Sequence, residues 1–137
     1  MSDSSREFFE KDALMNHAGE FGSYGEELAC RFYESRKFAI LERNFRCRLG
    51  EIDIIAENAD TIVFAEVKMR KDSSFAGAAE YVTYTKQKRI INAARFWLGK
   101  KKRPDKYLRF DVVEIYLPEG KVGKAYINLI DNAFECN

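Results

Sequence analysis

The sequence has only one histidine, His17, and three cysteines, and these small numbers narrow the chemistry open to the protein. Cys30, Cys47 and Cys136 are odd in number, lie far apart and form no C-x-x-C pair. They predict reduced thiols in a cytoplasmic protein rather than a disulfide framework or a zinc finger. One histidine cannot supply a zinc site by itself, and no Ser-His-Asp set can be built without it. Any chemistry must therefore use carboxylates, lysines and amides.

Long apolar runs are absent too, since the longest, such as residues 62–65, reach four residues. Crossing a bilayer takes roughly 20 apolar residues, and the charged start of the chain lacks the apolar segment of a secretory signal. We therefore expect a cytoplasmic protein with no membrane partner. The 23 basic and 22 acidic residues nearly balance, so any affinity for nucleic acid must come from local clusters of cations.

Hydrophobic periodicity predicts one domain over residues 19–137, preceded by a flexible or partly helical arm at residues 1–18. We expect helices near residues 23–37 and 84–99, strands at 38–46, 50–57, 61–70, 107–117 and 126–130, and a loop at 71–83. The turn residues Asn58-Ala59-Asp60 join two of these strands as a hairpin. This order predicts an α/β domain with a mixed sheet flanked by helices.

Charged residues interrupt the strand predicted at residues 61–70. Glu66 and Lys68 lie on one face of it, about 6–7 Å apart along the strand. Taken alone, this segment is typical of a strand that leaves the core with its charges solvated or paired.

Asp53 changes this interpretation, because it interrupts an otherwise apolar stretch of the neighbouring strand of the hairpin. Asp is depleted in strand interiors, and a buried carboxylate without a partner is costly. A second carboxylate, Glu66, on the adjacent strand raises that cost unless a cation lies between the two. Mg²⁺ prefers oxygen ligands of this kind, and Lys68 beside it could stabilise charge at phosphorus or orient a water.

Two further polar residues each have two interpretations. Ser23-x-x-Glu26 is a capping box, in which Glu26 would satisfy a backbone donor at a helix start. Glu26 also borders the apolar arc of that helix and could face the sheet. Gln87 lies nearly in line with the apolar stripe of the second helix, yet a local hydrogen bond would be an ordinary role for a first-turn amide.

The basic residues are unevenly distributed. Residues 86–103 hold eight basic side chains and no acid, and Arg43, Arg46 and Arg48 add three more. Runs of charge are usually solvated faces. Near an acidic metal site, however, such cations are what a phosphodiester backbone requires.

Several longer motifs occur in the order in which a known family has them. They are Gly22-x-x-Gly25-Glu26-x-x-Ala29, Arg43-Asn44-Phe45-Arg46, Gly50-Glu51-Ile52-Asp53-Ile54-Ile55, Phe64-Ala65-Glu66-Val67-Lys68-x-Arg70, Lys86-Gln87-x-Arg89 and Arg109-Phe110-Asp111-Val112-Val113. Over residues 19–134 the sequence resembles the YraN-like family of bacterial proteins, within the PD-(D/E)XK, or restriction-endonuclease-like, superfamily. The resemblance implies an αβββαβ core similar to that of archaeal Holliday-junction resolvases, and a Mg²⁺-dependent nuclease activity.

By motif, the resemblance puts the active-site positions at Glu26, Asp53, Glu66, Lys68 and Gln87. Asp53 and Glu66 would then hold Mg²⁺ or Mn²⁺ together with the carbonyl group of Val67. Lys68 would position or activate the attacking water, and Gln87 would brace the site. Contacts to nucleic acid are expected at Arg43, Arg46, Arg48, Arg70, Lys86, Lys88 and Arg89.

The leading interpretation is a metal-dependent endonuclease or a resolvase-like DNA-processing enzyme. The alternative is a non-catalytic nucleic-acid-binding module that keeps the fold and its basic face. A protein-interaction domain would not explain why the carboxylate of Asp53 interrupts an apolar strand. Branched, nicked and single-stranded DNA and RNA all stay open as substrates, and because related resolvases work as dimers, the resemblance also allows a homodimer.

Overall fold

The computed structural model describes residues 4–10, 21–70, 82–101, 105–116 and 124–135. Their elements are β1 (Ser4–Glu10), α1 (Phe21–Ser35), β2 (Ala39–Cys47), β3 (Gly50–Glu57), β4 (Thr61–Arg70), α3 (Tyr84–Lys101), β5 (Tyr107–Tyr116) and β6 (Lys124–Phe134). From α1 to β5 the order is αβββαβ, which confirms the predicted core, and β6 follows. His17, Cys136 and most of the predicted loop at 71–83 lie outside the described residues.

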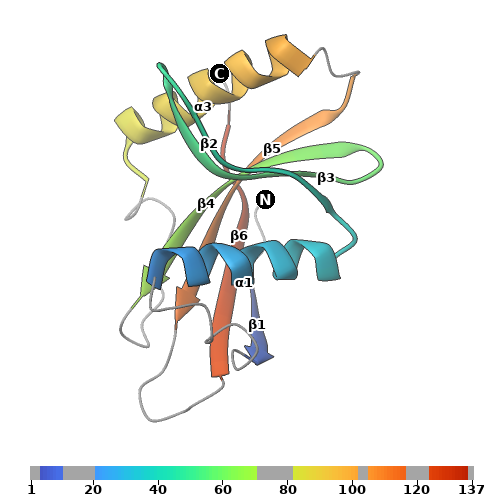
Figure 1. The fold of residues 1–137 in the computed structure, drawn as a ribbon, viewed down its shortest axis with the longest axis vertical. Coiled ribbons are helices and arrows are strands. Elements are labelled where there is room, and N and C mark those ends of the chain that lie inside the picture. Colours follow the sequence, from blue (N-terminus) through green and yellow to red (C-terminus); the bar gives the residue numbers. More distant parts are fainter. Residues whose placement is uncertain (1–3, 11–20, 71–81, 102–104, 117–123, 136–137) are drawn as a thin grey trace.

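The strands form one mixed sheet in the order β1-β6-β5-β4-β3-β2. All neighbouring strands are antiparallel except β4 and β5, which are parallel. A parallel pair needs a long crossover connection, and α3 lies within the one that joins β4 to β5. The predicted mixed sheet flanked by helices is therefore confirmed (Figure 1).

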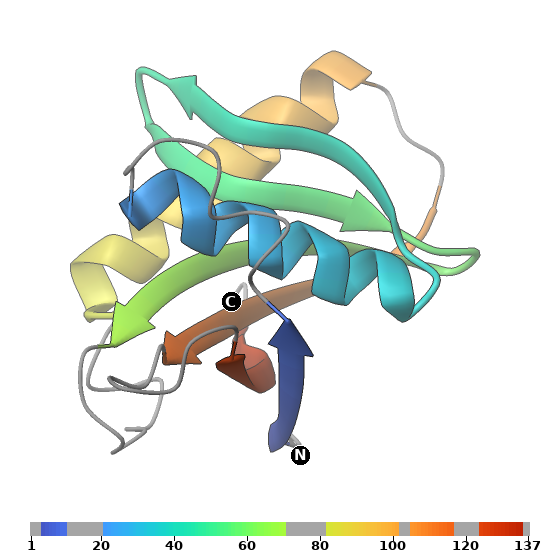
Figure 2. The ribbon, with the colours of Figure 1, turned by 60° about the horizontal axis from the view of Figure 1, so that its bottom comes forward.

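The two helices cover opposite faces of the sheet, and each buries its own core (Figure 2). Leu28 and Phe32 of α1 pack with Val63 of β4. On the other face, the Trp97 ring of α3 meets Phe64 edge-on, with ring centroids 6.0 Å apart. Successive residues of β4 thus belong to opposite cores, as the period of two along a strand requires. Neither helix of the described residues has the length and apolar composition needed to cross a bilayer.

Strand β1 contradicts the expectation of a flexible or partly helical arm at residues 1–18. Residues 4–10 pair antiparallel with β6, from Ser4 opposite Ile130 to Glu10 opposite Lys124. The physical reason lies in β6, which is longer than the strand predicted at residues 126–130. At a sheet edge its outer N–H and C=O groups would lack partners. Local periodicity cannot reveal a pairing between opposite ends of the chain.

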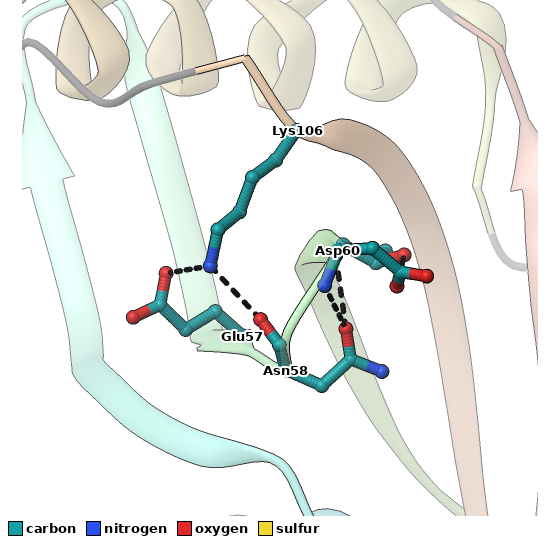
Figure 3. A network of polar contacts seen from close by, with 5 residues as sticks. Glu57, Asn58, Asp60 and Lys106 are labelled. Carbon is teal, nitrogen blue, oxygen red and sulfur yellow. Dashed lines mark hydrogen bonds and ion pairs between the residues drawn. The ribbon is translucent and has the colours of Figure 1, made fainter.

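The predicted hairpin of β3 and β4 closes on a network of polar contacts (Figure 3). The side-chain oxygen of Asn58 accepts hydrogen bonds from the backbone N–H groups of Asp60 (3.1 Å) and Thr61 (2.9 Å). Lys106, just before β5, donates to Glu57 Oε1 at 3.0 Å and to the Asn58 carbonyl at 2.9 Å. This network ties the turn to the start of β5 and thereby holds the closed end of the hairpin in register.

Candidate active site

The candidate site lies where the pairing of β3 with β4 ends. The register runs from Glu57 opposite Ile62 to Ile54 opposite Ala65, and the next residues on the two strands are Asp53 and Glu66. Beyond that point β3 stays paired with β2, and β4 stays paired with β5. In place of a ladder bond, the backbone N–H of Val67 donates to Asp53 Oδ2 at 2.8 Å. The two carboxylates thus come from neighbouring strands and meet at a fork in the sheet.

This position perturbs the ionisation of Asp53. Burial, followed by the negative charge of Glu66, raises the pKa of Asp53 to about 7, although the hydrogen bond from Val67 opposes the shift. Glu66 itself is only 5% exposed. Desolvation and a nearby like charge both disfavour the ionised form of a carboxyl group. The pair is therefore a place where an additional positive charge would be favourable.

Two lysine ammonium groups reach the same oxygen of Glu66. Lys68 Nζ lies 3.3 Å and Lys86 Nζ lies 2.5 Å from Glu66 Oε2. Lys68 comes from β4 itself. Lys86 comes from the first turn of α3, where Thr83 Oγ1 caps the helix by accepting the Lys86 N–H at 3.2 Å. Burial alone would lower the pKa of Lys86, but its contact with Glu66 outweighs burial and raises that pKa.

Glu26 is not part of a capping box, so that interpretation is wrong. Helix α1 begins at Phe21, which puts Ser23 inside the helix and Glu26 beyond its first turn. The Glu26 carboxylate accepts a hydrogen bond from Asn44 Nδ2 of β2 at 2.8 Å, and its charge contributes to the raised pKa of Asp53. Glu26 therefore belongs to the electrostatic surroundings of the fork.

Gln87 makes the local hydrogen bond that was its ordinary alternative. Its Nε2 group donates to the carbonyl oxygen of Val82 at 3.1 Å, and its backbone N–H donates to the Thr83 carbonyl at 2.8 Å. The amide thus braces the residues that lead into α3. Its effect on the site is indirect, because these are the residues that position Lys86.

The cations predicted on β2 and β4 are partly engaged with acids. Arg43 pairs with Glu27 at 2.9 Å, Arg46 with Glu51 at 3.6 Å, and Arg70 with Glu114 at 4.0 Å. Arg46 keeps a 76% exposed side chain, and Arg48, in the turn between β2 and β3, is exposed as well. Arg46 and Arg48 therefore present their charge to solvent.

The cations of α3 border a surface hollow. Lys88 lies over the ring of Tyr84, 5.3 Å from its centroid, and is exposed. Arg89 and Lys86 line a hollow of about 360 Å³ at the start of α3, whose remaining lining residues are Glu51, Thr83, Thr85 and Ile90. The helix comes close to β3 there, since a Cβ atom on Gly50 would lie 2.4 Å from the Arg89 carbonyl oxygen.

Sequence reasoning did not single out two further buried acids on β5, Asp111 and Glu114. Asp111 of β5 is 0% exposed and accepts two hydrogen bonds from Arg109 (2.9 and 3.0 Å) and one from the Tyr33 hydroxyl (2.7 Å). Burial raises the pKa of both Tyr33 and Asp111. Glu114, likewise fully buried, accepts from Asn128 at 2.7 Å. Acids that interrupt an apolar strand, the signal that revealed Asp53, could have revealed both.

The donor set at the fork fits a hard divalent cation. No group of three or more His, Cys, Asp and Glu side chains suited to a metal occurs within the part of the chain that the structure describes. Mg²⁺, however, usually takes only one or two protein carboxylates and completes its shell with water. Asp53 and Glu66 supply two, and a bound cation would offset the burial and the charge of Glu66 that together raise the pKa of Asp53.

The sequence profile of the uncharacterised protein family UPF0102 matches residues 25–115, which include all five predicted active-site positions. This chain belongs to the UPF0102 family. The UPF0102 protein of Caldicellulosiruptor bescii is 48% identical over 116 residues, 84% of this chain and 97% of the relative. That of Clostridium perfringens is 47% identical over 113 residues, 82% and 92% respectively. The YraN-like resemblance is thereby confirmed, since UPF0102 is that family.

Proposed function

We propose that this UPF0102 protein is a metal-dependent endonuclease or resolvase-like enzyme that hydrolyses phosphodiester bonds in DNA. The observation that carries the proposal is the fork between β3 and β4, where the half-buried Asp53 and the buried Glu66 form an acidic pair. Two ammonium groups, of Lys68 and Lys86, adjoin that pair. Carboxylates beside cations, held in place by a rigid sheet, are what phosphoryl chemistry needs to balance charge.

Asp53, Glu66 and the carbonyl group of Val67 would hold Mg²⁺ or Mn²⁺, which supplies Lewis-acid stabilisation of the charge that develops on the phosphate. Lys68 projects from the strand that carries Glu66. Its ammonium group stabilises the negative charge on the phosphate oxygens and orients the water that attacks phosphorus. Because the surroundings of Glu66 exclude most water, this interaction is stronger than it would be in bulk solvent.

The exposed cations around the fork would bind the nucleic-acid backbone. Arg46 pairs with Glu51, which lines the hollow at α3. Arg48 is exposed in the turn after β2, and Lys88 and Arg89 extend from the helix itself. Since the net charge of the chain is only +1, binding must come from this local cluster and should weaken steeply with salt. A homodimer would present two such sites to the two strands of a duplex, which sedimentation with and without DNA can test.

The test compares wild type with Lys68→Ala on a panel of four-way junctions, flaps, nicked duplex, single-stranded DNA and RNA, in Mg²⁺ and in Mn²⁺. Lys68 acts mainly on the transition state, so the variant should lose metal-dependent cleavage while its affinity for the substrate changes little. Lys106→Ala is the matched control, because Lys106 belongs to the turn network at the closed end of the hairpin. It should cleave like wild type.

Two results would overturn the proposal. If wild type binds a substrate but cuts none with either metal, and Lys68→Ala binds equally well, the protein is a nucleic-acid-binding module. If Lys68→Ala cleaves as fast as wild type, the active site lies elsewhere or the cleavage comes from a contaminant.

A further inference from the structure

Two positive charges converge on one buried oxygen atom at the fork. Lys68 and Lys86 both lie within ion-pair distance of Glu66 Oε2, while the Glu66 side chain is only 6% exposed. Like charges this close repel each other. Their proximity is favourable only as long as the carboxylate lies between them, so the arrangement depends on what else binds Glu66.

We propose that Lys86 is the resident counter-ion of Glu66, that a divalent cation displaces it, and that the freed ammonium group then binds a phosphate of the nucleic acid. This inference rests on the proposed function, because it takes Glu66 as a metal ligand. It makes Lys86 a positioning residue that couples metal binding to nucleic-acid binding at the same site.

Of the two lysines, Lys86 is the one that can leave. Lys68 is two residues from Glu66 on a strand that pairs with β5 along its whole length, with Lys68 opposite Glu114. Lys86 reaches Glu66 from a separate element, and its side chain is 37% exposed against 29% for Lys68. A flexible four-carbon stem lets an ammonium group move between neighbouring positions. A dication beside Glu66 would repel both lysines, and the one that can extend into solvent moves.

The surroundings of Lys86 show where it can move. With Arg89 it lines the hollow at the start of α3, so one side chain borders both the acidic pair and the basic surface. In the free protein its charge neutralises Glu66 and competes with metal. Once displaced, the same charge adds to the surface that faces the nucleic acid. Metal and nucleic acid should therefore strengthen each other's binding, as thermodynamic linkage requires.

The first test measures Mn²⁺ binding by calorimetry at pH 8.5, without nucleic acid. Lys86→Met keeps the apolar stem and removes the charge. The variant should bind Mn²⁺ about tenfold more tightly, because one positive charge that repels the ion is gone. Lys100→Met removes the same charge near the other end of the helix, where the lysine lies over Phe96, and should bind like wild type. If circular dichroism shows Lys86→Met to be unfolded, Lys86→Gln takes its place.

The second test uses Lys68→Ala as the background, so that no cleavage interferes. Mn²⁺ should increase the affinity of Lys68→Ala for its preferred nucleic acid, and adding Lys86→Met should reduce this increase. Mn²⁺ affinity of Lys86→Met equal to or below that of wild type would overturn the inference but leave the metal site intact. Absence of Mn²⁺ binding in wild type and in every variant would overturn both the inference and the proposed metal-dependent function.

Discussion

Replacing Asp53 by Asn should stabilise the protein at neutral and alkaline pH, although it alters the centre of the candidate site. The Asp53 carboxylate is half-buried beside Glu66, and burial together with the charge of Glu66 raises its pKa from 3.8 to about 7. Ionisation of Asp53 therefore lowers the free energy of unfolding. An Asn side chain carries no charge, and its carbonyl oxygen can still accept the Val67 N–H that now donates to Asp53 Oδ2 at 2.8 Å.

The sign and size of this stabilisation follow from proton linkage. The unfolded chain releases the Asp53 proton near pH 3.8 and the folded protein near pH 7, so the folded state binds more protons between these values. Stability of the wild type should fall as the pH rises through this window and level off above it. A shift of three units corresponds to about 4 kcal/mol, and residual solvation of a half-buried carboxylate reduces this to about 2–4 kcal/mol.

Urea unfolding from pH 4 to pH 8.5, in the presence of a chelator that removes divalent cations, measures this pH-dependent difference in stability. Asp53→Asn and wild type should have similar unfolding free energies at pH 4, and the variant should gain about 2–4 kcal/mol by pH 8. Asp105→Asn, at an exposed position, is the control and should follow the wild type at every pH. Mg²⁺ or Mn²⁺ should raise the melting temperature of wild type and not that of Asp53→Asn. A difference between Asp53→Asn and wild type that does not grow with pH would refute the reasoning.

Three further predictions concern packing and a buried hydrogen bond. Gly50→Ala would place a Cβ 2.4 Å from the Arg89 carbonyl oxygen, so α3 must move away from β3, and urea unfolding should show a loss of about 1–3 kcal/mol. Gly99→Ala, with nothing within 4 Å of the new atom, should instead stabilise α3 by up to about 1 kcal/mol. Tyr33→Phe removes the hydroxyl that donates to buried Asp111 at 2.7 Å and should cost about 1–3 kcal/mol. An unfolding free energy within about 0.5 kcal/mol of wild type, the range of neutral surface changes, would contradict this third prediction.

The sequence by itself determined the local elements and part of the site. The predicted bounds of β3 and β4 agree with the structure, because alternating apolar residues and the Asn58–Asp60 turn are local signals. A hairpin brings consecutive strands side by side, so the proximity of Asp53 and Glu66 followed from the same pattern. Lys68 lies two residues from Glu66 on one strand face, and its contact with that carboxylate needed no tertiary information.

Only the tertiary structure decided which side chains from the two helices act at the fork. Lys86 contacts Glu66 because α3 packs on the sheet with its first turn over β4. Glu26 acts on Asp53 because α1 packs on the opposite face and starts earlier than its apparent capping box. The pairing of β1 with β6 likewise joins opposite ends of the chain. Residue periodicity records which face of an element is buried, whereas the partner of that face depends on how all the elements together bury their apolar surface and satisfy their backbone hydrogen bonds.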